Sequence, residues 1–134
     1  MRILLVEDNA GDVYLVRRAL EGYGLADDLI VAQNGEIALQ LLAQAVADPP
    51  GKTPQLVLLD LNLPKVDGTQ VLSHIRHNET LATTPVIILT SSDLPSDRER
   101  ALALGANLYI KKPTDLQSFM QLGGAVENFL NSLH

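Results

Sequence analysis

The sequence predicts an α/β fold: a doubly wound, five-stranded parallel sheet with helices on both faces. Five short runs of Val, Ile and Leu recur along the 134 residues. They lack the polar alternation of a half-exposed strand, which is typical of strands covered on both faces. Between them, apolar residues recur every three to four positions, as in amphipathic helices. Alternating strands and helices predict a parallel sheet, because a parallel crossover needs a helix.

The predicted strands are the uninterrupted apolar runs, at residues 3–6, 29–32, 56–59, 86–89 and 108–110. Helical spacing follows the first three strands, at Val13, Val16 and Leu20, then Ile37, Leu41 and Ala45, then Val71, Leu72 and Ile75. Asn34-Gly35 opens the second helix, the Pro-Pro-Gly at 49–51 breaks the chain after it, and Gly105 is a helix C-cap.

The last predicted helix carries two special signals. Thr114, with Gln117 three residues later, predicts a capping box at its start. Gly123-Gly124 lies inside it, where each glycine costs about 1 kcal/mol relative to alanine. We therefore expect either a break in the helix or close packing against it, on the sheet or at an interface.

Composition limits the classes of function. The 134 residues are one domain's length without a linker, so we expect a single domain over 1–134 with no output domain. There is no cysteine, which excludes disulfides and thiolate metal sites. A net charge of -6 with scattered basic residues argues against direct nucleic-acid binding. Glu7-Asp8 ends the first apolar run at once, so we expect no signal peptide or membrane span, and a cytoplasmic protein.

Polar residues follow four of the predicted strands, at their carboxyl ends, where open α/β sheets bind ligands. They are Glu7-Asp8-Asn9, Asp60, Thr90-Ser91-Ser92 and Lys112-Pro113. Two carboxylates about 5 Å apart repel by roughly 3 kcal/mol at an effective dielectric near 20, so three of them require a cation. Oxygen ligands without His or Cys select a hard ion, and we predict Mg²⁺.

Asp60 is the predicted nucleophile toward a phosphoryl group. It stands alone after the third strand, which is central if the strand order is 2-1-3-4-5. The metal and Lys112 would neutralise the phosphoryl oxygens, and Thr90 would donate a hydrogen bond to one of them. Strand alternation places Lys112 and Lys111 on opposite sides, and this geometry alone does not choose between them. The bond between Lys112 and Pro113 is left open as cis or trans.

These motifs resemble the receiver domain of two-component response regulators over essentially the whole chain. The resemblance lies in ILLVEDN at 3–9, LVLLDLNLPKVDG at 56–68, VIILT at 86–90 and GANLYIKKP at 105–113. It implies the flavodoxin-like receiver fold with strand order 2-1-3-4-5. It also implies that Asp60 is the phosphoacceptor and that Glu7, Asp8, Asp60 and the backbone carbonyl of Asn62 bind Mg²⁺. The phosphoryl contacts would be Thr90 and Lys112, the lysine directly before proline.

The same resemblance implies a switch. Phosphorylation would draw the Thr90 hydroxyl inward, and the Tyr109 ring would rotate into the space that it leaves. A buried structural tyrosine is the alternative for Tyr109. Ser91, where a small residue is common, would affect how water reaches the acyl phosphate.

Within the family, LDLNLPKVDG, ILTSSD and KKPTDLQSF look most like single-domain regulators that partner cyanobacterial phytochrome histidine kinases. This implies phosphorylation by such a kinase and a homodimer through the fourth helix, fifth strand and fifth helix. Without an output domain, the signal would pass to a downstream protein.

Three other functions compete with a phosphorylation switch that acts only on itself. A Mg²⁺-dependent phosphohydrolase would want a second acid beside the nucleophile and a cap, but the residue two past Asp60 is Asn62. A mononucleotide binder would want backbone amides where Glu7 and Asp8 stand. A receiver-shaped module without phosphorylation would not need all five polar residues.

Overall fold

The computed structural model describes residues 1–47 and 53–133. Its five strands form one parallel sheet in the order β2-β1-β3-β4-β5, which confirms the predicted architecture. The strands are β1 (Arg2–Val6), β2 (Asp28–Ala32), β3 (Leu56–Leu59), β4 (Val86–Thr90) and β5 (Leu108–Lys111). The observed strands therefore differ from the predicted ones by at most one residue at each end.

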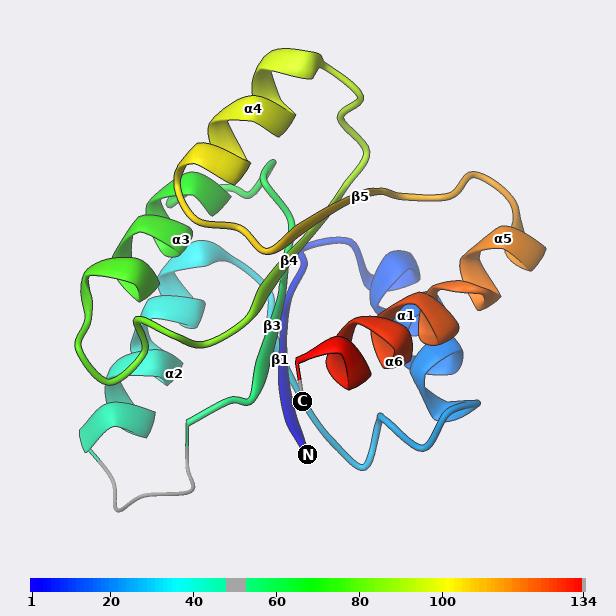
Figure 1. The fold of residues 1–134 in the computed structure, drawn as a ribbon, viewed down its shortest axis with the longest axis horizontal. Helices are drawn as coiled ribbons and strands as arrows, with labels where there is room; N and C mark the ends of the chain where they lie inside the picture. Colours follow the sequence, from blue (N-terminus) through cyan, green and yellow to red (C-terminus); the bar gives the residue numbers. More distant parts are fainter. Residues whose placement is uncertain (48–52, 134) are drawn as a thin grey trace.

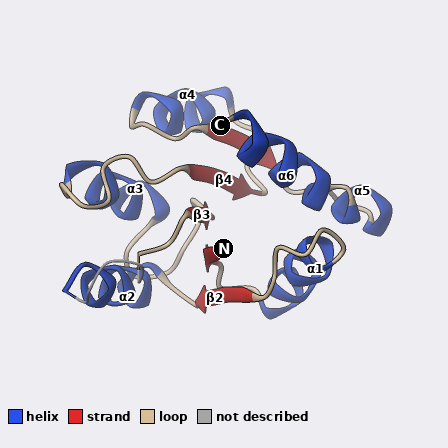
Figure 2. Ribbon diagram, turned by 60° about the horizontal axis from the view of Figure 1, so that its bottom comes forward, coloured by secondary structure: helices blue, strands red, loops and turns tan. Residues whose placement is uncertain are grey.

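Helices cover both faces of the sheet (Figures 1 and 2). One face carries α1 (Ala10–Glu21), α5 (Leu116–Met120) and α6 (Leu122–Ser132); the other carries α2 (Gly35–Ala47), α3 (Gly68–His77) and α4 (Pro95–Ala103). No described helix is both long and apolar enough to cross a bilayer.

Alternation along the strands divides the core between these two faces. Leu56 and Leu58 of β3 pack with residues of α1 and α6, whereas Val57 and Leu59 pack with residues of α2 and α3. In β5, Leu108 and Ile110 belong to the first cluster and Tyr109 to the second. Successive side chains of each strand thus point to opposite faces of the sheet, and the polar residues that follow the strands continue the same alternation.

Two of the predicted helix boundaries are confirmed. The Asn34 side chain accepts a hydrogen bond from the Ile37 N–H at 2.8 Å, just before α2 begins at Gly35. Gly105, with a φ of +105°, follows the C-cap residue of α4, and this left-handed conformation favours glycine. The predicted break at 49–51 lies outside the described residues.

The last helical segment differs from the prediction in two ways. Asp115, not Thr114, is the N-cap, because its carboxylate accepts from both the N–H and the hydroxyl of Ser118 and a negative charge is favoured at a helix start. The helix divides at Gln121, ahead of the glycines rather than at them. The glycines do not pack on the sheet: a Cβ on Gly123 would lie 2.2 Å from the Ala19 carbonyl oxygen of α1, and a Cβ on Gly124 would lie 2.9 Å from the Tyr23 hydroxyl, just after α1.

Arg76 ties two loops together at the amino-terminal end of the sheet, opposite the predicted site. Its guanidinium donates to the carbonyl oxygens of Thr84 at 2.7 Å, Gly105 at 2.9 Å and Ala82 at 3.2 Å. It also donates to the Asn107 side chain at 2.9 Å. The loop after α3 is therefore joined to the loop after α4.

Gly68 allows the loop after β3 to fold tightly under the start of α3. A Cβ on Gly68 would lie 2.2 Å from the backbone oxygen of Asp60 and 2.7 Å from the Cα of Leu61. We expect Gly68→Ala to lower the free energy of unfolding by about 3 kcal/mol, because neither backbone atom can move without shifting β3.

Urea unfolding measures this loss, and Gly22→Ala is the matched control. A Cβ on Gly22 would meet its nearest neighbour at an ordinary 3.8 Å, so the control should be as stable as the parent protein or slightly more stable. Equal stabilities of the two variants would contradict the role of Gly68.

Candidate functional site

Three polar residues that follow strands are held in place by the sheet's own hydrogen bonds. The Glu7 N–H donates to the Ala32 carbonyl at 3.0 Å, and the Asp60 N–H donates to the Val6 carbonyl at 3.1 Å. The Lys112 N–H donates to the Thr90 carbonyl at 2.7 Å. Parallel pairing thus continues one residue past β1, β3 and β5, and it delivers these side chains to one end of the sheet.

The Lys112 ammonium is the centre of this group. Its Nζ lies 2.6 Å from Glu7 Oε1, 3.0 Å from Asp60 Oδ2 and 2.9 Å from Asp12 Oδ2. The Lys112 side chain is 9% exposed, and those of Glu7 and Asp60 are 1% and 6% exposed. A buried ammonium shared by three carboxylates replaces the water that each group has lost.

Glu7, Asp8 and Asp60 offer oxygen atoms within 4.8 Å of one another, as the sequence predicts. Asp8 is exposed, whereas Glu7 and Asp60 are buried. Three convergent carboxylates, one of them open to solvent, form a donor set that fits a hard divalent cation with room for water. The Asn62 N–H donates to Asp60 Oδ1 at 3.1 Å, which fixes the orientation of the Asp60 carboxylate.

The pKa values of Glu7 and Lys112 are both raised, for different reasons. Burial, reinforced by the charge of Asp60, raises the pKa of Glu7 from 4.5 to about 7, against the lowering effects of Lys112 and the Asn9 N–H. Burial alone would lower the pKa of Lys112, but its hydrogen bonds to Glu7, Asp12 and Asp60 outweigh burial and raise it. Lys112 therefore stays charged at neutral pH, and a cation that binds Glu7 competes with a proton.

Thr90 lies next to these residues but is not brought into contact with their carboxylates. It is fully buried, and within residues 1–47 and 53–133 its hydroxyl is the one buried side-chain oxygen or nitrogen without a hydrogen-bond partner. Thr90 is in phase with Ile88, which packs toward α3, whereas Asp60 is in phase with Leu58, which packs toward α1. An unpartnered buried hydroxyl is costly, so this position is prepared for an acceptor.

Tyr109 is buried on the same face as Thr90, against α4. Its hydroxyl donates to the Ser92 carbonyl at 2.9 Å, and the Arg98 guanidinium lies 5.8 Å from the centre of its ring. Ser92 in turn donates to the Asp97 carboxylate in the first turn of α4. Tyr109 therefore connects the end of β4 to the start of α4.

The two lysines that strand alternation leaves open are separated clearly. Lys112 points into the acidic group, whereas Lys111 pairs on the surface with Asp93 at 3.1 Å. Among the described residues no peptide bond is cis, so the bond between Lys112 and Pro113 is trans.

Asp12 is the site residue that the sequence does not single out. It lies in the first turn of α1, where acidic residues are common for a helical reason alone. Its partner Lys112 is 100 residues away. The available signal was positional: the first turn of a helix that follows β1 lies over the carboxyl end of that strand.

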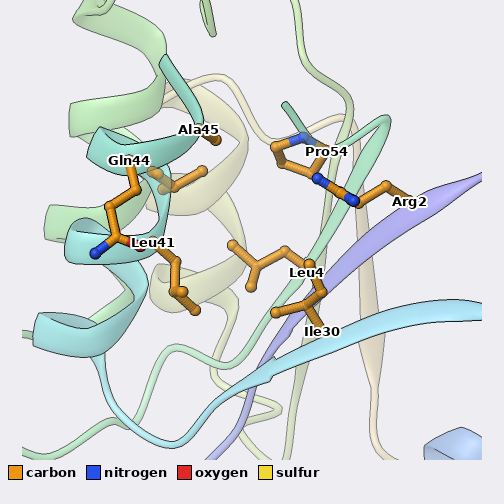
Figure 3. A pocket seen from close by; sticks show the side chains of 8 residues that line it. Arg2, Leu4, Ile30, Leu41, Gln44, Ala45 and Pro54 are labelled. Atoms are coloured by element: carbon orange, nitrogen blue, oxygen red, sulfur yellow. The ribbon is translucent and has the colours of Figure 1, made fainter. Parts of the chain in front are cut away.

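A separate hollow of about 200 Å³ lies at the other end of β1 (Figure 3). It is lined by Arg2, Leu4, Ile30, Leu41, Leu42, Gln44, Ala45 and Pro54. This lining is mostly aliphatic and contains no carboxylate, so it offers nothing to the chemistry that the acidic group supports.

Comparison with known proteins decides the family. Residues 3–122 match the family model of the response regulator receiver domain. The chain belongs to this family. Receiver domains are signalling switches that histidine kinases phosphorylate, and they bind a divalent cation at an acidic pocket. In this receiver, Glu7, Asp8 and Asp60 form an acidic cluster at the carboxyl end of the sheet.

Individual relatives agree with the family match. Response regulator Rcp1 of Synechocystis sp. is 36% identical over 127 residues, 95% of this receiver and 86% of Rcp1. The crystal structure of the phosphorylated cyanobacterial phytochrome response regulator RcpA has a TM-score of 0.88 at 35% identity, covering 99% of this chain and 95% of that one. The Mn²⁺-bound form of Rcp1 has a TM-score of 0.84 at 36% identity, covering 96% and 92%.

Proposed function

We propose that this receiver accepts a phosphoryl group on Asp60 from the phosphohistidine of a sensor kinase. The observation that carries this proposal is the position of the Asp60 carboxylate, which is buried between a charged ammonium and two further carboxylates. The Asn62 N–H and Lys112 hold one Asp60 oxygen each. The nucleophile is thus oriented before any donor arrives.

In the proposed reaction, an Asp60 oxygen attacks phosphorus as the phosphorus–nitrogen bond of the donor breaks. The imidazole leaves with the bonding electron pair and takes a proton from water. The Lys112 ammonium neutralises charge on the transferred oxygens. Thr90, whose hydroxyl is unpartnered, donates a hydrogen bond to one of them.

We propose Mg²⁺ as the cation of this site, with Glu7, Asp8, Asp60 and the backbone carbonyl of Asn62 as protein ligands. When bound, Mg²⁺ supplies positive charge that offsets both the carboxylates and the incoming phosphoryl oxygens. The all-oxygen donor set supports a hard ion, and the exposure of Asp8 leaves a way in from solvent.

The proposed output is a change at Thr90 and Tyr109. A bond from the Thr90 hydroxyl to the phosphoryl group gives that hydroxyl its missing partner and alters the space beside Tyr109. Because Tyr109 contacts Ser92 and Arg98, this change reaches the start of α4. The receiver catalyses only its own phosphorylation and dephosphorylation, and passes its signal to a protein target.

A phytochrome histidine kinase is the proposed partner, because RcpA is a cyanobacterial phytochrome response regulator by its description. We also propose a homodimer through α4, β5 and the last helices, whose exposed apolar residues include Leu102, Leu116 and Leu133. Transfer from an autophosphorylated cyanobacterial phytochrome, compared with an unrelated histidine kinase, tests the partner. A strict monomer in sedimentation, with and without phosphorylation, would contradict the dimer.

The test of the function is chemical. The protein is incubated with acetyl phosphate, with Mg²⁺ or with a chelator, and analysed by intact mass. We expect one phosphoryl group per chain only with Mg²⁺, stable in acid and labile in base. Reduction of the acyl phosphate with borohydride should mark Asp60 in the peptide map. Steady release of phosphate from unrelated esters would favour the phosphohydrolase instead.

A further inference from the structure

Among the described residues, Asp12 is the one ion-pair partner of Lys112 that has no part in the proposed binding of the metal and the phosphoryl group. The other two partners, Glu7 and Asp60, belong to the acidic group that converges within 4.8 Å, and Asp12 does not. Asp12 reaches the ammonium from α1, on the solvent side, with its side chain 28% exposed. Glu7 and Asp60 therefore contact Lys112 as members of the acidic group, whereas Asp12 contacts it from outside that group.

The availability of Asp12 follows from how α1 begins. Asp12 is the third helical residue, from which a side chain commonly reaches back to the N–H of the N-cap residue. Here the N-cap Asn9 donates its N–H to Glu7 Oε2 at 3.2 Å, while its side chain accepts from the Asp12 N–H at 2.9 Å. The Asp12 carboxylate is thus left to bind Lys112.

The charges on the other two partners change during the proposed cycle. A cation at the acidic group draws on the oxygens of Glu7 and Asp60, and phosphorylation replaces the Asp60 carboxylate with an acyl phosphate whose charge lies on the transferred oxygens. Of the three partners of Lys112, only Asp12 keeps a carboxylate that neither the cation nor the phosphoryl group occupies. Without it, the ammonium would depend on the same oxygens that the cation and the phosphoryl group require.

We propose that Asp12 is a positioning residue: it holds the Lys112 ammonium beside Asp60 while the cation and the phosphoryl group occupy the other carboxylates. This role rests on the proposed function and specifies how the lysine is kept in place. When Asp12 is removed, Lys112 keeps its two buried partners, Glu7 and Asp60, so the folded state still balances its charge. The main effect of Asp12 is therefore on the rate of phosphorylation.

The test compares Asp12→Asn, Asp12→Glu and Asp93→Asn with the parent protein. Asp93 pairs with Lys111 at a similar distance, 3.1 Å, but on the surface, so its variant is the matched control. Initial rates are measured over a range of acetyl phosphate concentrations with saturating Mg²⁺. We expect Asp12→Asn to lower the maximal rate about tenfold, as for one lost charged hydrogen bond, with the half-saturating donor concentration within twofold of the parent.

Two further results are expected, because Asp12→Glu keeps the charge and Asp93→Asn leaves Lys112 untouched. Asp12→Glu should recover at least a third of the parent rate, and Asp93→Asn should match the parent. A maximal rate of Asp12→Asn within twofold of the parent overturns the role, as does an equal loss in Asp93→Asn or in Asp12→Glu. If the parent protein is not labelled at all, the proposed function itself is overturned. If the parent and Asp12→Asn are labelled at the same rate, only the role of Asp12 is overturned.

Discussion

Asp60→Ala should take up no phosphoryl group from acetyl phosphate and Mg²⁺. The nearest other carboxylates cannot substitute: Glu7 is buried with its oxygen 2.6 Å from Lys112, and Asp8 lies toward solvent. Asp60 lies at the end of the central strand β3, with one oxygen held by the Asn62 N–H and the other by Lys112. The expected loss is complete, because the reaction forms a covalent bond to this side chain.

The fold of Asp60→Ala should survive. Removing one of three crowded carboxylates relieves repulsion, which is roughly 3 kcal/mol for two unit charges 5 Å apart at an effective dielectric of 20. Lys112 keeps Glu7 and Asp12 as partners. Asp27→Ala, which removes an exposed acid from the loop before β2, is the control and should label fully. Labelling of Asp60→Ala equal to that of Asp27→Ala would mean that another residue is the nucleophile.

Lys112→Ala should be the most destabilising charge substitution at the site, by about 3 kcal/mol without divalent cation. The reason is that Glu7 and Asp60, with side chains 1% and 6% exposed, lose their shared ammonium. Added Mg²⁺ should restore most of the loss, because it provides positive charge to the same oxygens. Urea unfolding at pH 8, with a chelator or with Mg²⁺, measures both effects.

Lys111→Ala is the control for this comparison. Its ion pair with Asp93 is exposed to solvent, and such pairs contribute less than about 1 kcal/mol. Its stability should not respond to Mg²⁺ differently from the parent. Equal losses in the two lysine variants, or no recovery of Lys112→Ala in Mg²⁺, would show that Lys112 does not balance the acidic group.

The sequence predicts the strands and the acidic group well, because both depend on local patterns. Uninterrupted apolar runs mark strands that are covered on both faces, and the residue after each run must lie at the carboxyl end of the sheet. Strand order then brings Glu7, Asp60 and Lys112 together. The end of β3 contributes a single acid, Asp60, but its central position follows only from the strand order, which the family resemblance implies and the pattern alone does not.

The features that the sequence does not predict are the N-cap of α5, the contact of Gly123 and the role of Asp12. Each depends on which of several similar side-chain contacts the folded chain makes. Thr114 and Asp115 are both good N-caps, and the choice depends on the hydroxyl of Ser118, which binds the carboxylate. The close contact of Gly123 with α1 requires knowing which helix lies beside it. Asp12 follows the ordinary pattern of a helix start, and only the folded chain shows that it meets Lys112.

The hydrogen bonds from Arg76 to Gly105 and Asn107 fix the chain just after the C-terminal end of α4. The N-terminal end of this helix is held by fewer hydrogen bonds, those of Ser92 with Asp97 and with Tyr109. We therefore expect a small displacement at Thr90 to rotate α4 about its C-terminal end. The largest displacement should occur at Leu94, an exposed apolar residue at the start of the helix.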